Sequence, residues 1–205
     1  MNTKETILDS ALTLFSEKGY DAVSVAEIAG AVGIKAPSLY KHFPSKQAIF
    51  DAILEKMQDD YTQRASSLGM DGSDAASDST KFSDVSEDSL VGMVIDLFGY
   101  FLHDPYVSRF RRMLTIEQFS GRGSADLLSS MYFDGPVGYQ GSLFGILISG
   151  GVLGGGEPDV LALEFYSPVF ILLTVCDRQP DREDECISLL ERHVRGFCSL
   201  HRVVP

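Results

Sequence analysis

Cationic and hydroxyl-bearing side chains concentrate in one short stretch near the N-terminus of the 205-residue chain. Between residues 28 and 50 there are three lysines and no acidic residue, although the whole chain carries a net charge of −12. Lysines neutralise phosphates and release counterions, while hydroxyl and imidazole groups donate hydrogen bonds to phosphate oxygens. This stretch therefore offers phosphate binding. The side chains that would supply it are Ser24, Lys35, Ser38, Tyr40, Lys41, His42 and Lys46.

If the phosphates belong to DNA, the residues next to Lys35 would lie near the bases, and these residues are apolar. Ala36 and Pro37 offer only apolar contacts, which suit a thymine methyl group. No arginine, asparagine or glutamine stands beside them for bidentate recognition of a base. We therefore expect modest base discrimination, with sequence preference depending on DNA shape and on the spacing of two copies.

The alternative interpretation is that these lysines form an ordinary solvated surface. The distribution of charge along the chain helps to decide between this interpretation and phosphate binding. Residues 1–64 carry seven Lys or Arg against nine Asp or Glu, a net charge of −2. The remaining residues carry ten against twenty, a net charge of −10. Most of the negative charge thus lies away from the lysines, which would let one end of the chain approach a polyanion.

Two short helices joined by a glycine turn must position these side chains. Ser24 and Glu27 form a capping box, in which each side chain accepts a backbone N–H at the start of a helix. Gly33 can adopt a positive φ, and Pro37 suits the first turn of a following helix that runs to about Phe43. This is the pattern of a helix-turn-helix, whose second helix enters the major groove of DNA.

Helical periodicity continues through the rest of the chain, and no segment alternates as a strand would. The longer helices are expected over residues 3–18, 45–66, 90–103, 105–119, 125–149 with a break at Gly135 and Pro136, 158–176 and 181–201. Residues 67–89 are rich in Ser, Asp and Gly, so we expect an exposed connection there. The prediction is an all-α protein of about nine helices.

The segment from Thr3 to Phe50 resembles the N-terminal domain of the TetR family of bacterial transcriptional repressors. The resemblance rests on FSEKGY at the end of the first helix and on SVAEIAGAVGIKAPSLYKHFPSK across the turn. It implies a three-helix DNA-binding domain over residues 1–46 and a larger helical domain for ligand binding and dimerisation over residues 47–205. The helix over residues 45–66 would connect the two.

The resemblance also assigns DNA contacts to single positions. The residues that would face or approach bases are Val25, Ala26, Ala36, Pro37 and Tyr40. Those that would hold phosphates are Ser24, Lys35, Ser38, Tyr40, His42 and Lys46. Family members often have Ser or Thr where Lys35 stands, so a weaker cap is expected for the third helix. Some members place a basic base-reading residue where Ala26 stands, so little base discrimination is expected from the second helix.

The function implied by the resemblance is that of a sequence-specific DNA-binding regulator, a repressor released by a small-molecule effector. It would bind a near-palindromic double-stranded operator as a homodimer, in the bacterial cytoplasm and at the nucleoid, with no cofactor and no membrane. The alternative is a DNA-binding regulator without a small-molecule pocket, controlled by a protein partner. No catalytic triad or pair of catalytic carboxylates is evident, so an enzyme is not expected.

Aromatic, methionine and polar residues of the middle helices are candidates for the effector pocket, although such residues also suit any core. These candidates are Phe98, Phe101, His103, Phe110, Met113, Gln118, Met131, Tyr132, Gln140 and Phe144. The last two helices have apolar faces wide enough to pack on their own domain and on a second copy. The dimer candidates on them are Phe165, Val169, Leu172, Leu190, Val194 and Phe197.

The arginines and cysteines show no motif of a catalytic or metal site. Arg109, Arg111 and Arg112 leave an anionic effector open, with solvation as the other interpretation. Three cysteines lie in the last thirty residues without metal-ligand spacing, so we expect no metal. The N-terminus lacks the pattern of a signal peptide, and the longest apolar run, residues 143–153, is shorter than the roughly twenty residues of a membrane span.

Overall fold

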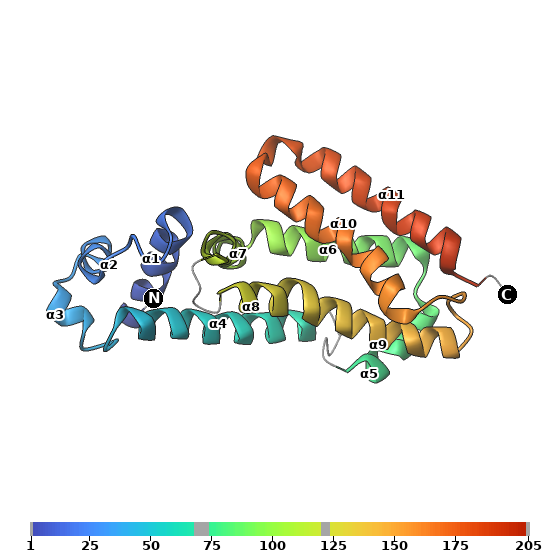
Figure 1. The fold of residues 1–205 in the computed structure, drawn as a ribbon, viewed down its shortest axis with the longest axis horizontal. Helices are drawn as coiled ribbons and strands as arrows, with labels where there is room; N and C mark the ends of the chain where they lie inside the picture. Colours follow the sequence, from blue (N-terminus) through green and yellow to red (C-terminus); the bar gives the residue numbers. More distant parts are fainter. Residues whose placement is uncertain (1, 68–73, 120–123, 204–205) are drawn as a thin grey trace. The chain divides into compact units, whose positions relative to one another are not determined.

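The computed structural model describes residues 2–67, 74–119 and 124–203, and these form helices with one isolated backbone bridge, between Leu153 and Arg202. The helices pack into two compact units, each built from two separate segments of the chain (Figure 1). The first unit comprises residues 1–64 and 105–128, and the second comprises residues 65–104 and 129–205. The predicted all-α fold is confirmed.

Helices from the N-terminal part and from the middle of the chain build the first unit. Its elements are α1 (Thr3–Lys18), α2 (Val25–Val32), α3 (Ala36–Leu39), most of α4 (Lys46–Ser67), α7 (Pro105–Glu117) and most of α8 (Ser124–Ser129). At its centre the rings of Phe15, Tyr20 and Phe50 lie with their centroids 5.2 to 6.3 Å apart. Such tilted and edge-on contacts are the favoured geometry for aromatic pairs, and they hold α1 against the start of α4.

The second unit is a bundle around a core to which α6, α9, α10 and α11 contribute. Its elements are α5 (Ala75–Asp84), α6 (Glu87–His103), the π-helical turn η1 (Ser130–Asp134), α9 (Gly135–Ser149), α10 (Pro158–Arg178), the short 3₁₀ turn η2 (Pro180–Arg182) and α11 (Glu183–His201). Phe165 of α10 lies 5.8 Å from Phe144 and 4.9 Å from Phe197, centroid to centroid. These rings join three helices at the middle of the core.

The prediction of an exposed connection over residues 67–89 is wrong for its described part. Residues 75–84 form α5, and Asp78 on this helix is fully buried. The Tyr139 hydroxyl of α9 donates a hydrogen bond of 2.7 Å to Asp78 Oδ2. A polar composition hid this helix, because its buried carboxylate is satisfied by a residue 61 positions away. Residues 68–73 of the expected connection lie outside the described residues.

The helix expected over residues 125–149 is divided into α8, η1 and α9. Pro136 has no N–H to donate to the carbonyl of Tyr132, four residues earlier. The hydroxyl of Tyr166 on α10 donates to that carbonyl instead, at 2.8 Å. With this division and the addition of α5, the described residues form eleven α-helices where about nine were expected.

One described helix, α10, is long and apolar enough to meet a length and composition criterion for crossing a membrane, with a mean hydropathy of 1.7. The sequence predicts a helix with a wide apolar face over residues 158–176, but only the run at residues 143–153 is compared there with the length of a membrane span. Core helices of water-soluble proteins meet the same criterion, so a single such helix is weak evidence for a membrane. Leu161, Phe165 and Leu173 of α10 pack in the core of the second unit.

Candidate nucleic-acid interface and ligand cavity

The helix-turn-helix forms as its sequence predicts. The backbone N–H of Ser24 donates to Glu27 Oε2 at 2.8 Å, and the N–H of Glu27 donates to Ser24 Oγ at 3.2 Å. Gly33 ends α2 in the left-handed conformation with a φ of 77°, which glycine adopts without strain. Ile28 and Leu39 are fully buried and fix α2 and α3 to the first unit.

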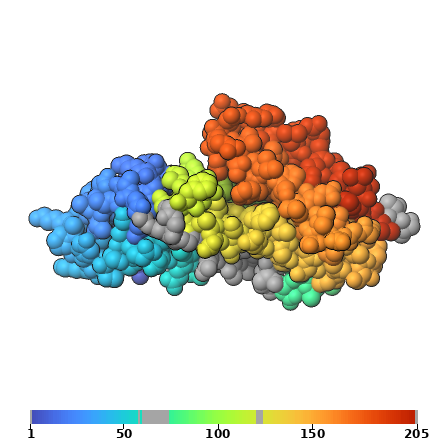
Figure 2. All heavy atoms as spheres, viewed as in Figure 1, coloured from blue at the N-terminus to red at the C-terminus, as the bar shows by residue number. Residues whose placement is uncertain are grey.

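The turn around α3 presents cations and an aromatic hydroxyl to solvent. Tyr40, at the end of α3, is 51% exposed, and Lys35, Lys41 and His42 are also exposed. In Figure 2 the light-blue atoms of this part of the chain form an outer edge of the first unit. Lys35 makes no side-chain hydrogen bond to the start of α3, which confirms the predicted weak cap.

The remaining predicted DNA-contact residues have mixed exposure. Ala26 and Pro37 are exposed, whereas Val25, Ala36 and Ser38 are half-buried. Ser24 is exposed, but its hydroxyl also lies 3.0 Å from Glu27 Oε2. The turn therefore offers more freely placed groups at residues 40–42 than at residue 24.

Lys46 is engaged within the protein. Its ammonium group donates to the carbonyls of Tyr20 and Val23, at 2.8 and 2.7 Å, and lies 4.2 Å from the centre of the Tyr20 ring. The side chain is half-buried and ties the start of α4 to the loop between α1 and α2. No local pattern in the sequence indicates this structural role, because the partner carbonyls are 23 and 26 residues away.

Glu27 is a carboxylate beside the predicted phosphate contacts, and its charge is already compensated. The backbone and side-chain hydrogen bonds from Ser24 lower the pKa of Glu27, with a smaller contribution from Lys18, whose Nζ lies 3.3 Å from Oε1. The carboxylate also adds negative charge near the N-terminal end of α2, where the helix dipole favours it. The carboxylate is therefore ionised at near-neutral pH and held in place by these hydrogen bonds.

Two polar contacts hold α7 against the N-terminal part of the first unit. Glu117 Oε1 accepts the backbone N–H of Tyr20 at 2.7 Å, and a Cβ at Gly19 would meet the same oxygen at 2.7 Å. Gly19 has a φ of 80°, so both its conformation and its surroundings favour glycine. Arg109 Nη2 lies 2.6 Å from Asp9 Oδ1 on α1.

The structure corrects the interpretation of Arg109 and Arg111 as solvated groups or as a site for an anionic effector, whereas Arg112 agrees with solvation. Arg109 is paired with Asp9, and Arg111 is almost fully buried. Arg112 is exposed. A sequence separation of about a hundred residues hides the Asp9–Arg109 pair from any local pattern.

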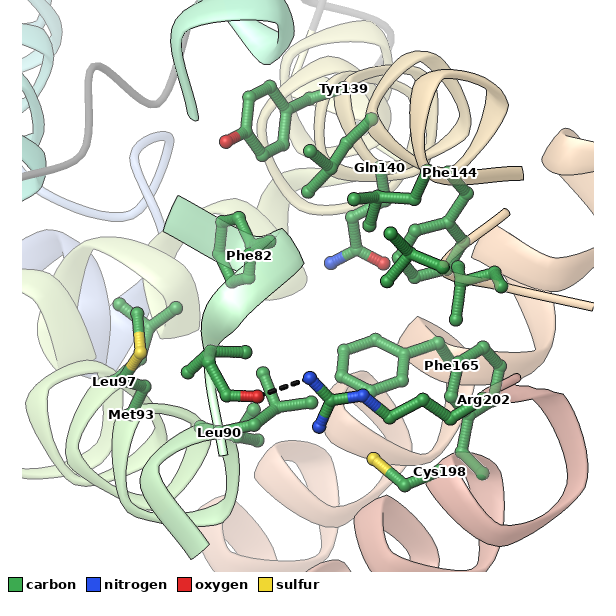
Figure 3. A pocket seen from close by; sticks show the side chains of 17 residues that line it. Phe82, Leu90, Met93, Leu97, Tyr139, Gln140, Phe144, Phe165, Cys198 and Arg202 are labelled. Atoms are coloured by element: carbon green, nitrogen blue, oxygen red, sulfur yellow. Dashed lines mark hydrogen bonds between the residues drawn. The ribbon is translucent and has the colours of Figure 1, made fainter. Parts of the chain in front are cut away.

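A cavity of about 150 Å³ lies within the second unit. The residues that line it come from α5, α6, α9, α10, α11 and the segments after α5, α9 and α11, and most are aliphatic or aromatic. Figure 3 shows Phe82, Phe144 and Phe165 around the open space, with the Gln140 amide group directed toward it. The cavity has the apolar lining with few polar groups that is typical of small-molecule sites.

Four lining residues carry polar side-chain atoms, and they differ in how those atoms are bonded. Tyr139 donates to Asp78, and Arg202 reaches the carbonyl of Val85 across the cavity (Figure 3). Gln140 Oε1 is buried and has no hydrogen-bond partner within the described residues. Burial raises the pKa of the Cys198 thiol above its ordinary value, with Glu87 adding to the shift, while Arg202 and Arg195 oppose it.

Two of the ten predicted pocket residues, Gln140 and Phe144, line this cavity. Phe98 is a core residue of the second unit, and the Phe101 ring lies 6.1 Å from that of the buried Tyr132. Met131 is half-buried on η1.

The other predicted pocket residues lie at other places. Phe110 and Met113 are buried on α7 in the first unit, and Gln118, directly after α7, donates to the Thr115 carbonyl 2.7 Å away. His103 Nε2 lies 2.6 Å from Glu183 Oε1. Phe82 and Arg202 also line the cavity without a signal in the sequence. Phe82 lies on α5, whose composition resembles a connection, and Arg202 follows the last helix.

The predicted dimer residues face the interior of their own unit. Phe165, Val169 and Leu172 of α10 are at most 9% exposed, and all six candidates belong to the core or its border. Another face of α10 carries exposed apolar residues at helical spacing, namely Val160, Leu163 and Ile171. Leu189 and Leu200 of α11 are likewise exposed.

The three cysteines are buried thiols. Burial, with a hydrogen bond to Cys186, raises the pKa of Cys176 to about 12, so its thiol stays protonated at neutral pH. His193 Nε2 lies 2.9 Å from the Phe165 carbonyl, and His201 Nε2 lies 3.3 Å from Glu164 Oε1. Among the described residues, no three His, Cys, Asp or Glu side chains are grouped to hold a metal ion.

Residues 7–53 match the family model of the bacterial regulatory proteins of the tetR family. The biofilm operon icaADBC HTH-type negative transcriptional regulator IcaR of Staphylococcus aureus is 54% identical over 48 residues, which are 23% of this chain and 26% of that protein. Its counterpart from Staphylococcus epidermidis is 46% identical over 52 residues, 25% and 28% of the two chains. The match thus spans about a quarter of the length of these relatives.

Solved structures extend the likeness to the whole fold. A regulator of the TetR family from Mesorhizobium loti has a TM-score of 0.68 at 19% identity, covering 98% of this chain and 97% of that one. The SmeT–triclosan complex has a TM-score of 0.68 at 19% identity, with coverages of 100% and 96%. SmeT is the repressor of a multidrug efflux pump of Stenotrophomonas maltophilia.

The capped α2, the left-handed glycine turn and the short α3 define a helix-turn-helix protein, with a helical second unit. The family match lies on this helix-turn-helix, and the fold of the entire chain is that of the solved relatives. Within residues 7–53 the sequence is that of the tetR family of bacterial regulatory proteins, and beyond them the likeness is one of fold.

Proposed function

We propose that the protein is a transcriptional repressor that binds operator DNA as a homodimer and is released by a small molecule bound in the second unit. The observation that carries the proposal is the exposed cationic turn around α3, within the segment that matches the family. The relatives over that segment are named as negative transcriptional regulators, which favours repression over activation. The proposed location is the bacterial cytoplasm, at the nucleoid, because the operator is there.

Phosphate binding is assigned mainly to the groups that the fold leaves exposed. Lys35 and Lys41 would neutralise phosphates, while Tyr40 and His42 would donate hydrogen bonds to phosphate oxygens. Ser24, Ser38 and Lys46 stay proposed contacts, although Ser24 and Lys46 also have structural partners. Val25, Ala26, Ala36 and Pro37 would approach the bases and give modest discrimination.

The dimer is assigned to the exposed faces of α10 and α11. Val160, Leu163 and Ile171 stand at spacings of three and eight residues, which place them along one side of α10. Figure 2 shows the orange and red atoms of both helices at the surface of the second unit. A symmetric pair of such faces would bury this apolar surface and present two helix-turn-helix motifs to a near-palindromic operator.

The small-molecule response is assigned to the cavity of the second unit. Four residues of α6 line it, and α6 ends at His103, two residues before α7 begins. Because α7 contacts α1 through the Arg109–Asp9 pair, a displacement of α6 would be passed along the chain to the first unit. A ligand can weaken DNA binding only as far as it prefers the released conformation.

DNA binding is tested by capturing fragments of the host genome and measuring their affinity by electrophoretic mobility shift. Tyr40→Ala with Lys41→Ala should weaken binding to the captured fragments strongly and leave the melting temperature unchanged. Lys81→Ala is the matched control, because Lys81 is exposed and lies on α5 in the other unit. Equal affinities for all three proteins would overturn the proposal.

The small-molecule role is tested separately, against control by a protein partner. A ligand that binds the native cavity raises the melting temperature as its concentration rises. Filling the cavity with Val94→Phe should abolish that shift and leave DNA binding intact, since Val94 lines the cavity from α6. If the variant protein responds to ligands as the native protein does, the cavity is not the effector site. If neither protein responds to any ligand, control by a protein partner is favoured.

A further inference from the structure

The size of the cavity limits the ligand to a small molecule. A dry cavity of about 150 Å³ with an apolar lining holds a single benzene ring. The cavity of the second unit has about the same volume and is lined by aromatic and aliphatic side chains from several helices. A monocyclic aromatic compound therefore matches it better than a ligand with several fused rings.

The polar atoms of the lining limit the chemistry of that ring. Gln140 Oε1 is a buried acceptor without a hydrogen-bond partner in the described part of the chain, and such an atom is costly to leave unsatisfied. The hydroxyl of Tyr139 is occupied by Asp78, and the Arg202 guanidinium is drawn to the Val85 carbonyl. A ligand with one hydrogen-bond donor would satisfy the Gln140 oxygen.

The charges around the cavity favour a neutral ligand over a cation. No Asp or Glu stands among the residues that line it within the described chain, so a buried cation would have no counter-charge there. Arg202 is the charged residue of the lining, and one of its N–H groups is already donated to a carbonyl. An anion would have to compete with that contact.

We infer that the cavity binds a neutral monocyclic phenol, whose ring lies among Phe82, Phe144 and Phe165 and whose hydroxyl donates to Gln140 Oε1. This inference rests on the proposed effector role of the cavity and names the ligand class. The ring would replace empty space by apolar contact. The hydroxyl would supply the hydrogen bond that the fold leaves open.

The test compares p-cresol, p-xylene and p-toluate on the native full-length protein, by calorimetry and thermal shift without DNA. p-Cresol and p-xylene have similar size and differ in the hydroxyl, so p-cresol should bind about tenfold more tightly. p-Toluate, an anion at neutral pH, should bind more weakly than p-cresol. Equal affinity for p-cresol and p-xylene, or no binding of either, would overturn the inference.

A variant pair locates the hydrogen bond. Gln140→Leu should reduce the preference for p-cresol over p-xylene to about onefold, because no acceptor remains. Gln118→Leu makes the same change directly after α7, away from the cavity, and should keep the preference. Preferred binding of p-toluate would assign the site to Arg202 and an anion instead, and the comparison of ligands on the native protein decides this even where Gln140→Leu fails to fold.

The inference and the proposed function can fail separately. Binding of p-cresol is measured on the protein alone, whereas release is measured by adding p-cresol to the complex with captured DNA. Binding without release leaves the ligand class standing and contradicts the effector mechanism. DNA binding that no phenol relieves, together with an absence of p-cresol binding, leaves the DNA-binding role standing and contradicts the ligand class.

Discussion

At the scale of single residues, solvent exposure distinguishes side chains that can bind DNA from side chains that stabilise the fold. Lys41 and Lys46 look alike in sequence, five residues apart in one basic stretch. In the structure Lys41 is exposed, whereas the Lys46 ammonium donates to two backbone carbonyls and lies over the Tyr20 ring. A substitution at Lys46 therefore cannot report on DNA contact alone.

Lys46→Ala is expected to destabilise the first unit, because the carbonyls of Tyr20 and Val23 lose their donor. The expected loss in the free energy of unfolding is about 1–3 kcal/mol, measured by urea denaturation. Lys35→Ala serves as the control, since the exposed Lys35 makes no capping hydrogen bond. If the two variants unfold at the same urea concentration, Lys46 has no structural role.

Glu27 gives a prediction for the dependence of stability on pH. Its pKa in the folded protein lies below the ordinary value of 4.5, chiefly because of the hydrogen bonds from Ser24. A depressed pKa stabilises the folded state above the unfolded pKa, and this stabilisation is lost as the pH falls through the folded pKa.

Glu27→Gln should therefore lower the melting temperature at about pH 7, and the difference from the native protein should shrink toward about pH 3. Glu5→Gln provides a second capping-box variant, at the start of α1. A difference for Glu27→Gln that stays constant over this range would show that the carboxylate charge does not contribute.

At this scale, contacts between residues close in the sequence could be predicted from the sequence. The capping box of Ser24 and Glu27 and the turn at Gly33 involve residues within a few positions, and both formed as predicted. The contacts Tyr20–Glu117 and Asp9–Arg109 join residues about a hundred positions apart. No local periodicity encodes such pairs, so only the folded chain reveals them.

At the scale of helices, α5 shows why composition misleads. Its residues are mostly small and polar, yet Asp78 is buried against α9 and bonded to Tyr139. The benefit of burying α5 comes from Phe82 and from satisfied polar atoms, and neither is visible as an apolar stripe. The π-helical turn before α9 is a second case, since the carbonyl of Tyr132 bonds to Tyr166 on another helix.

Tyr139→Phe tests the docking of α5. The substitution removes one donor from the fully buried Asp78 carboxylate, which should lower the free energy of unfolding by about 1–3 kcal/mol. Tyr40→Phe, at the exposed end of α3, is a matched control for the loss of a hydroxyl. A stability change no larger than that of the control would mean that the Asp78–Tyr139 bond does not anchor α5.

At the scale of the whole molecule, the proposed repressor needs two copies of the chain. Modest base discrimination by one α3 makes operator specificity depend on two recognition helices at a fixed spacing. The residues first predicted to form the dimer are buried in their own subunit, and the exposed face of α10 takes their place in the proposal. The wide apolar faces were recognisable in the sequence, but which side packs inward was not.

Ile171→Asp should convert the dimer to a monomer, because a charge would enter the proposed interface at a residue that is 57% exposed in the single chain. Sedimentation velocity measures the change, and operator affinity should fall with it. Ile146→Asp, at another exposed position in the second unit, is the control. A dimer that survives Ile171→Asp places the interface elsewhere.

The salt dependence of operator binding shows whether the turn around α3 binds DNA phosphates. Each lost phosphate contact reduces the slope of log K against log salt by about one, so Lys41→Ala in a dimer should reduce it by about two. The variant should melt at the native temperature, because Lys41 is exposed. An unchanged slope with unchanged affinity would contradict the account.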